Sequence, residues 1–173
     1  KKRLTDVHYL AAVVVVLEMD RPLTQYYWMN IADPDVPFLG LIEHTNMLPK
    51  EWYDGRNVLY LTNYLDRTDP LFSLSKDELL DLYLPHLTKF NPQFDRSWIK
   101  KVHYNALSAA QPIIGTNYSK AIADHRTPVK KLYLANTTQI YPEDRGTNYS
   151  IKMGRELANM IVEDEQHDWK RWK

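Results

Sequence analysis

The segment Lys131–Ala158, KLYLANTTQIYPEDRGTNYSIKMGRELA, carries the strongest signal for the fold of this chain. It begins with an apolar, β-prone run, passes through a turn rich in Asn, Thr, Pro, Asp and Gly, and ends in a helical pattern. This order predicts a strand at Leu132–Ala135 and a helix from about Asn148 to Val162. A helix start offers unpaired N–H groups and the positive end of the helix dipole to a ligand. A capped helix start without any ligand gives the same local pattern.

Glycine usage sets a limit on how a nucleotide could bind. The 173 residues contain five glycines, and no two of them are spaced as G-x-G. Neither the dinucleotide-binding fingerprint nor a phosphate-binding loop is therefore present in this sequence.

The residues YLANTTQIYPEDRGTNYSIKMGRELA, with YYWMNIADPDVPFLGLIEH and AQPI upstream, resemble FAD-dependent oxidoreductases of the amine oxidase, protoporphyrinogen oxidase and phytoene desaturase superfamily. More narrowly, they are similar to a bacterial NAD(P)/FAD-dependent subfamily. The superfamily carries its G-x-G-x-x-G domain at the amino terminus. The resemblance therefore implies a carboxy-terminal fragment of an FAD-binding protein. We expect the fragment alone to bind FAD weakly or not at all, because the pyrophosphate site lies in the missing domain.

The resemblance also implies which residues meet the cofactor. In the superfamily a strand delivers a Gly-Asp pair to the ribityl and phosphate region, and the next helix start approaches the isoalloxazine ring. Here that pair falls on Asn136-Thr137, a departure that removes a carboxylate. The implied cofactor-binding residues are Asn136, Thr137, Asp144, Arg145, Gly146, Thr147 and Asn148. By their chemistry alone, Asp144 and Arg145 could instead pair with each other and stiffen the turn.

Four residues are candidates for substrate binding: Tyr27, Trp28, His44 and Gln111. Aromatic rings give a pocket a large apolar area with a polar tip, although such rings also pack sheets against helices. His44, next to Glu43, could act as a base or an orienting group, or lie inertly on the surface. Gln111 stands out only through the resemblance. No residue can be named as catalytic, and the G-x-S-x-G elbow of hydrolases is absent.

The predicted fold is α+β, with an antiparallel or mixed sheet of five or six strands and helices on one face. A valine-rich strand at Leu10–Met19 is expected to be buried on both faces. A capping box at Ser75 and Glu78 begins a helix that Pro85 should kink or split before about Phe90. The other expected strands are 26–31, 38–44, 58–64 and 98–104, while 106–114 has no clear preference.

The domain prediction places a sheet domain, resembling the substrate-binding domain of amine-oxidase-like flavoproteins, at residues 1–130. Residues 131–173 form a strand, turn and helix that would complete the FAD-binding domain. If the last helix normally packs on that domain, its apolar residues Ile151, Leu157 and Ile161 would be partly exposed and could allow self-association. The charged tail beyond Val162 is expected to fray.

Composition excludes several functional classes. Lys+Arg and Asp+Glu both number 22, so no net charge directs the chain to nucleic acid. The absence of cysteine excludes disulfides, a catalytic thiol and Cys-ligated metals, and suits a cytoplasmic protein. The six histidines lack H-x-x-x-H or H-x-H spacing, so no metal site is predicted. The longest apolar run, Tyr9–Leu17, is too short to cross a bilayer.

The expected function is therefore flavin-dependent oxidation, in which a small-molecule substrate gives a hydride from a C–N or C–C bond to the flavin. The protein would supply orientation and electrostatics, because the redox chemistry belongs to the cofactor. The expected partner is the missing amino-terminal FAD-binding domain. Two alternatives remain open: a non-catalytic sheet domain that binds a small molecule or protein, and a redox-neutral flavoenzyme of the UDP-galactopyranose mutase type.

Overall fold

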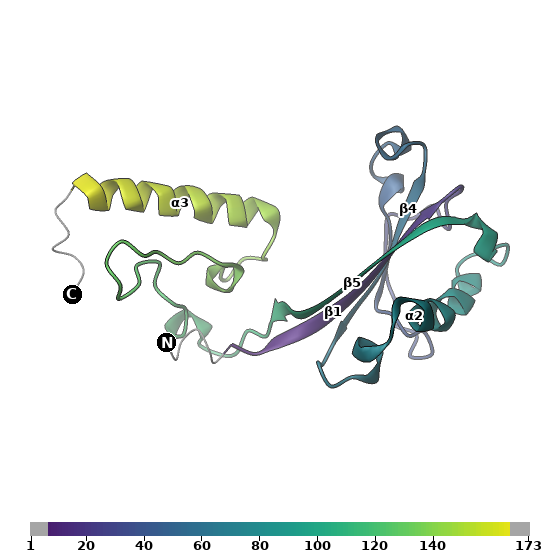
Figure 1. The fold of residues 1–173 in the computed structure, drawn as a ribbon, viewed down its shortest axis with the longest axis horizontal. Helices are drawn as coiled ribbons and strands as arrows, with labels where there is room; N and C mark the ends of the chain where they lie inside the picture. The colour runs from purple at the N-terminus through teal and green to yellow at the C-terminus, as the bar shows by residue number, and fades with distance from the viewer. Residues whose placement is uncertain (1–6, 167–173) are drawn as a thin grey trace. The chain divides into compact units, whose positions relative to one another are not determined.

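The computed structural model describes residues 7–166, which divide into two compact units (Figure 1). One unit is Tyr9–Gln111, and the other contains residues 7–8 and 112–166 of the described chain. Residues 112–130 thus belong to the same compact unit as the carboxy-terminal helix. The assignment of residues 1–130 and 131–173 to a substrate-binding and an FAD-binding domain stays a prediction.

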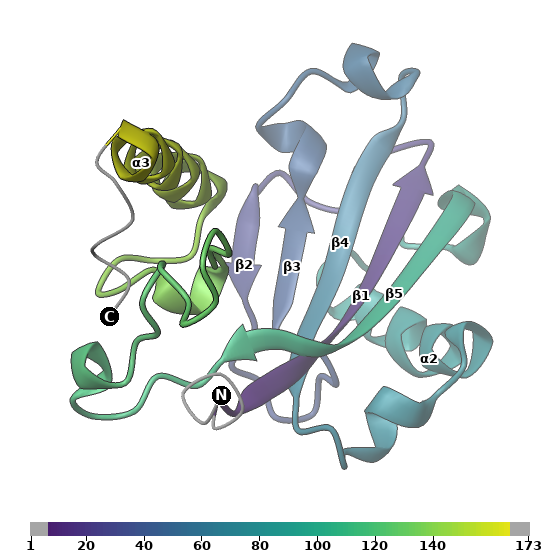
Figure 2. The same cartoon turned by 60° about the vertical axis from the view of Figure 1, so that its left-hand side comes forward.

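The first unit is built on a five-stranded sheet in the order β2-β3-β4-β1-β5 (Figure 2). β1 pairs antiparallel with β4, β4 with β3, and β3 with β2. The α+β class and the antiparallel sheet are confirmed. The strands are β1 (Tyr9–Met19), β2 (Trp28–Asn30), β3 (Gly40–Glu43), β4 (Asn57–Leu65) and β5 (Ile99–Pro112).

A short helical layer covers one face of this sheet. α2 (Lys76–Tyr83) begins with the predicted capping box, in which the Ser75 N–H donates to Glu78 Oε2 at 2.9 Å and Ser75 Oγ accepts the Glu78 N–H. Because Pro85 cannot donate a backbone hydrogen bond, the α-helix gives way to a 3-10 turn at Leu84–Lys89. The predicted interruption of the helix is confirmed.

The core lies between α2 and the face of the sheet to which odd-numbered residues of β1 and β4 point. Val13, Val15, Leu17 and Met19 of β1 are completely buried, whereas the even-numbered Val14 and Val16 are only half-buried. The prediction that this strand is buried on both faces was therefore wrong. The period-2 alternation of a strand divides its side chains between two faces, and helices cover only one of them.

Two strand predictions needed correction. β5 continues through the Ala- and Ser-rich residues 106–112, because pairing with β1 outweighs their weak β propensity.

The predicted strand at Leu132–Ala135 is absent. Tyr133 makes only an isolated bridge with Arg126, and the chain then enters a 3-10 turn at Thr137–Gln139. This turn is stabilised by the Asn136 side chain, which offers the backbone a local alternative to a sheet ladder.

The second unit is dominated by α3 (Thr147–Gln166). It continues past the predicted end at Val162 because the buried Asp164 is held by hydrogen bonds from Arg126 and the Tyr133 hydroxyl. The expected fraying is thus wrong for residues 163–166, while 167–173 lie outside the described residues. Across residues 7–166, no helix combines the length and apolar character needed to span a membrane.

Leu61→Ala should destabilise the chain by about 2–5 kcal/mol, because Leu61 is fully buried between Val15 and Leu41 of the neighbouring strands. Urea denaturation at constant m-value measures this loss. Leu107→Ala is the matched control: Leu107 lies in β5 with 60% of its surface exposed, and its truncation should cost less than about 0.5 kcal/mol. Equal losses for the two variants would contradict the assigned core.

Candidate functional site

The face of the sheet opposite α2 carries a row of apolar and aromatic side chains. The strand registers pair Trp28 with Ile42, Ile42 with Tyr60, and Tyr60 with Val16. Residues directly opposite each other in antiparallel strands project from the same face. These four side chains therefore form a continuous row, and Trp28 at its edge is 54% exposed. We call this surface the open face.

His44 is fixed at the edge of the open face. Its Nε2 lies 2.6 Å from the Tyr53 hydroxyl, and its ring makes edge contacts with the rings of Tyr53 and Tyr60. The imidazole is thus held by a phenol and packed between aromatic rings. The hydrogen bond at Nε2 and the ring contacts therefore fix the orientation of the imidazole.

The other side of the open face carries charge. Glu18 of β1 accepts a 2.7 Å hydrogen bond from His103 Nε2, and Lys101 Nζ lies 3.8 Å from the same carboxylate oxygen. The hydrogen bond from His103 is the main reason that the pKa of Glu18 lies below its usual value. The open face is thus apolar and aromatic at β2, β3 and β4, and carries ionic groups at β1 and β5.

The predicted substrate residues fall at both edges of the sheet. Tyr27 and Trp28 have ring centroids 6.2 Å apart, and together with Tyr26, which is 58% exposed, they form an aromatic edge. His44 directly follows the neighbouring strand β3. Gln111 lies near the end of β5, the opposite edge strand of the five. The structure thus groups three of the four predicted residues and separates the fourth from them.

Glu43 is a buried carboxyl group that sequence reasoning did not single out. Its side chain has no exposed surface, and its Oε2 accepts the N–H groups of Leu23 at 3.0 Å and Thr24 at 3.2 Å. Its Oε1 has no hydrogen-bond partner. Burial raises the pKa of Glu43 to about 7, although the two N–H groups act in the opposite direction. Its position two residues after Leu41, on the buried side of β3, was the available signal.

The predicted cofactor segment begins with a side chain that is already engaged. Asn136 Oδ1 accepts the Thr138 N–H at 2.9 Å, and the Asn136 N–H donates to Gln139 Oε1 at 2.9 Å. These bonds cap the 3-10 turn. Thr137, within the turn, is exposed. The Asn136 side chain therefore stabilises this turn even without a ligand.

The start of α3 is different, because its hydrogen-bonding groups remain available. Gly146 precedes the helix and has no side chain to cap it, and within the described residues no acceptor takes the N–H groups of Thr147, Asn148 or Tyr149. Asp144 Oδ1 accepts the backbone N–H of Arg145 at 2.8 Å. The alternative of an Asp144–Arg145 ion pair is not realised.

The Arg145 side chain lies in the same turn and is half-buried. Its Nε is buried and has no hydrogen-bond partner. A Cβ atom on Gly146 would lie 2.5 Å from Asn148 Oδ1, so glycine allows the Asn148 side chain to fold closely over the turn. The segment thus combines a guanidinium, a helix N-terminus and close backbone approach, which is the donor set for an anion.

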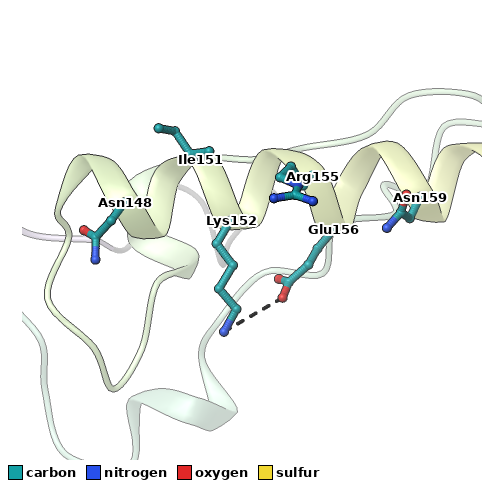
Figure 3. Close-up of a pocket in the computed structure, with 6 residues that line it drawn as sticks. All are labelled: Asn148, Ile151, Lys152, Arg155, Glu156 and Asn159. Atoms are coloured by element: carbon teal, nitrogen blue, oxygen red, sulfur yellow. Dashed lines mark ion pairs between the residues drawn. The ribbon is translucent and has the colours of Figure 1, made fainter.

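A shallow groove of about 330 Å³ follows the surface of α3 (Figure 3). Lys152 and Glu156 project from the same side of the helix and form a weak ion pair at 4.0 Å, whereas Ile151 projects from the opposite side (Figure 3). Ile151 is 60% exposed, whereas Leu157 and Ile161 are half-buried. The groove residues are Asn148, Ile151, Lys152, Arg155, Glu156 and Asn159.

No protein-family model matches the sequence, and no curated protein matches it. Solved structures share its fold. A "putative protoporphyrinogen oxidase" from Exiguobacterium sp. 255-15 superposes with a TM-score of 0.69 over 94% of this chain, at 12% sequence identity. An oxidoreductase from Methanosarcina mazei superposes with a TM-score of 0.52 over 76% of this chain, at 16% identity. The chain spans 37% and 30% of the lengths of these two proteins.

The described residues show no metal centre: between positions 7 and 166, no group of three or more His, Cys, Asp or Glu side chains is placed to hold a metal ion.

Asp164→Asn should loosen the carboxy-terminal end of α3. Arg126 holds both Asp164 oxygens at 2.6 and 2.7 Å, and loss of the charge should cost about 1.5–3 kcal/mol. Hydrogen exchange of the α3 amides measures the effect. Glu156→Gln removes only the exposed pair with Lys152 and should change exchange little. Similar exchange in both variants would contradict the anchoring role of Asp164.

Proposed function

We propose that this chain is the substrate-binding and carboxy-terminal part of an FAD-dependent oxidoreductase of the amine-oxidase-like superfamily. The observation that carries the proposal is the shared fold. Almost the whole chain, 94% of it, superposes on about a third of the Exiguobacterium protein, whose name states an oxidase. The second structural neighbour is also named as an oxidoreductase.

The open face supports the substrate-binding half of this proposal. A sheet covered by helices on one face and lined on the other by Trp28, Ile42 and Tyr60 presents a flat apolar surface to a ligand. Aromatic rings with polar tips suit an unsaturated or aromatic substrate. The hydrogen-bonded pair of His44 and Tyr53 would orient a polar group of that substrate at the edge of the surface.

The start of α3 supports the cofactor half. The free N–H groups of Thr147 and Asn148 fit an electron-rich, anionic group, and the half-buried Arg145 places a positive charge in the same turn. When bound, FAD supplies the hydride-accepting chemistry. Residues of this chain would orient the ring, with the helix dipole and the two N–H groups stabilising negative charge at its N1/C2=O edge.

A second candidate is a sheet domain that binds a small molecule or a partner protein without flavin. The specific observation in its favour lies at Asn136-Thr137, where the Gly-Asp pair of the superfamily pattern would fall: the carboxylate is absent, and the Asn136 side-chain oxygen caps its own turn. This candidate predicts tight ligand binding by the open face without any dependence on FAD. A redox-neutral flavoenzyme shares the cofactor site and differs only in its products.

The complete polypeptide encoded by the gene from which this chain comes should purify with the two-banded visible spectrum of oxidised flavin, and should release FAD on denaturation. The isolated chain should bind FAD weakly or not at all. A folded, complete polypeptide that stays colourless with added FAD would overturn the proposal and favour the flavin-independent candidate.

Within the complete polypeptide, Asn148→Ala should weaken FAD retention several-fold, because Asn148 closes over the turn at the start of α3. Asn159→Ala is the matched control, since it removes the same exposed side chain from the middle of the same helix. Flavin content after gel filtration measures both variants. Equal retention would count against a flavin at the start of α3.

A further inference from the structure

The segment from Leu23 to Tyr27 leads into the aromatic edge and is held by three side chains that follow it in the sequence, those of Glu43, Asn46 and Asn91. Asn46 Nδ2 donates to Thr24 O at 2.9 Å and to Tyr26 O at 3.2 Å. Asn91 Nδ2 donates to Leu23 O at 2.9 Å. Both amides are uncharged at all ordinary pH values, so their hold on the segment does not vary with pH.

Glu43 provides the remaining hold, and it alone among these side chains can titrate. Its carboxyl oxygen Oε2 accepts the N–H groups of Leu23 and Thr24, while its own backbone N–H donates to Tyr27 O at 2.8 Å. The residue therefore contacts both ends of the segment. Its other oxygen, Oε1, is buried without a partner.

We propose that Glu43 is a positioning residue that keeps the Leu23–Tyr27 segment closed while its carboxyl is protonated, and that ionisation favours an open segment. In the closed state a neutral carboxyl accepts both N–H groups through Oε2 and leaves no charge in the core. An ionised carboxylate would place a charge there with an unpaired oxygen, which is costly. Opening the segment would let water reach that charge.

The raised pKa of Glu43 supports this reading. A folded-state pKa of about 7, against an ordinary value of 4.5, means that the closed segment binds the proton more tightly than an open one. The stability of the closed state is therefore complete below about pH 4.5 and falls as pH rises towards 7. Over this interval the opening constant should rise about tenfold per pH unit, and it should level off above it.

The surrounding ionisable groups do not provide an alternative cause. Burial is the cause that raises the Glu43 pKa, and no charged neighbour contributes to it. His44 bonds to Tyr53, Asp20 pairs with Arg21 at 2.8 Å, and Lys89 pairs with Asp33 at 2.8 Å. The segment Leu23–Tyr27, the residue after Glu43 and the paired strand β4 carry the ionisable side chains Tyr26, Tyr27, His44, Tyr60 and Tyr64. The helical layer over the buried face carries Lys76, Asp77, Glu78, Asp81, Tyr83, His86 and Lys89.

The consequence for binding lies at the aromatic edge. Tyr26 and Tyr27 belong to the segment, and Trp28 begins the three-residue strand β2 directly after it. An open segment would move these rings and alter the edge of the open face. The relevance to a substrate rests on the proposed function, whereas the opening equilibrium belongs to this chain with or without flavin.

The experiment measures amide hydrogen exchange at Leu23 and Thr24 between pH 4.5 and 8 by NMR, corrected for intrinsic exchange rates, on this chain without FAD. Protection should fall about a hundredfold in total by pH 7. In Glu43→Gln, whose side chain mimics the neutral carboxyl, protection should stay high at every pH. Glu18→Gln, which alters a half-buried carboxylate on the open face, should behave like the unmodified chain.

Two results would overturn the proposal. One is protection of Leu23 and Thr24 that is constant with pH in the unmodified chain, and the other is pH-dependent protection that persists in Glu43→Gln. If Glu43→Gln fails to fold, the ¹³C resonance of the Glu43 carboxyl in the unmodified chain decides the question. Titration near the ordinary value of 4.5 would contradict the proposal. Because no flavin is present, these outcomes are independent of the FAD-retention experiment.

Discussion

One-sided burial of the sheet is the constraint on which the rest of the first unit depends. Leu79, Leu80 and Tyr83 of the helical layer pack on the fully buried alternate residues of β1 and β4. Because strand side chains alternate between faces, burying one set necessarily leaves the other set on the opposite face. The open face, with its row from Trp28 to Val16, is thus a direct consequence of core packing.

An ionisable group also lies on the buried face of the sheet. Glu43 occupies a position of the buried face at the end of β3, where its carboxyl accepts the backbone N–H groups of Leu23 and Thr24. A carboxyl group at this position ties the preceding loop to the sheet. Together with Asn46 and Asn91, this side chain holds the segment that leads into the aromatic edge.

Features with local causes could be predicted from the sequence, and features with tertiary causes could not. The Ser75 capping box and the interruption at Pro85 depend on neighbouring residues, so both were predicted correctly. The full length of β5 depends on pairing with β1, and the end of α3 depends on Arg126, which is 38 residues from Asp164. Of the candidate site, the sequence pointed to Tyr27, Trp28 and the helix start, whereas the strand expected at Leu132–Ala135 is reduced to an isolated bridge at Tyr133, and Glu43 was overlooked.

Hydrogen exchange at the start of α3 tests the central functional claim most directly. It would be measured on the complete polypeptide, with and without added FAD, at the amides of Thr147, Asn148 and Tyr149, which no group in the described part of the chain accepts. We expect FAD to slow exchange at these three amides and to leave those in the middle of α3 unchanged. Flavin binding that leaves all three unaffected would contradict the assignment of this helix start to the cofactor.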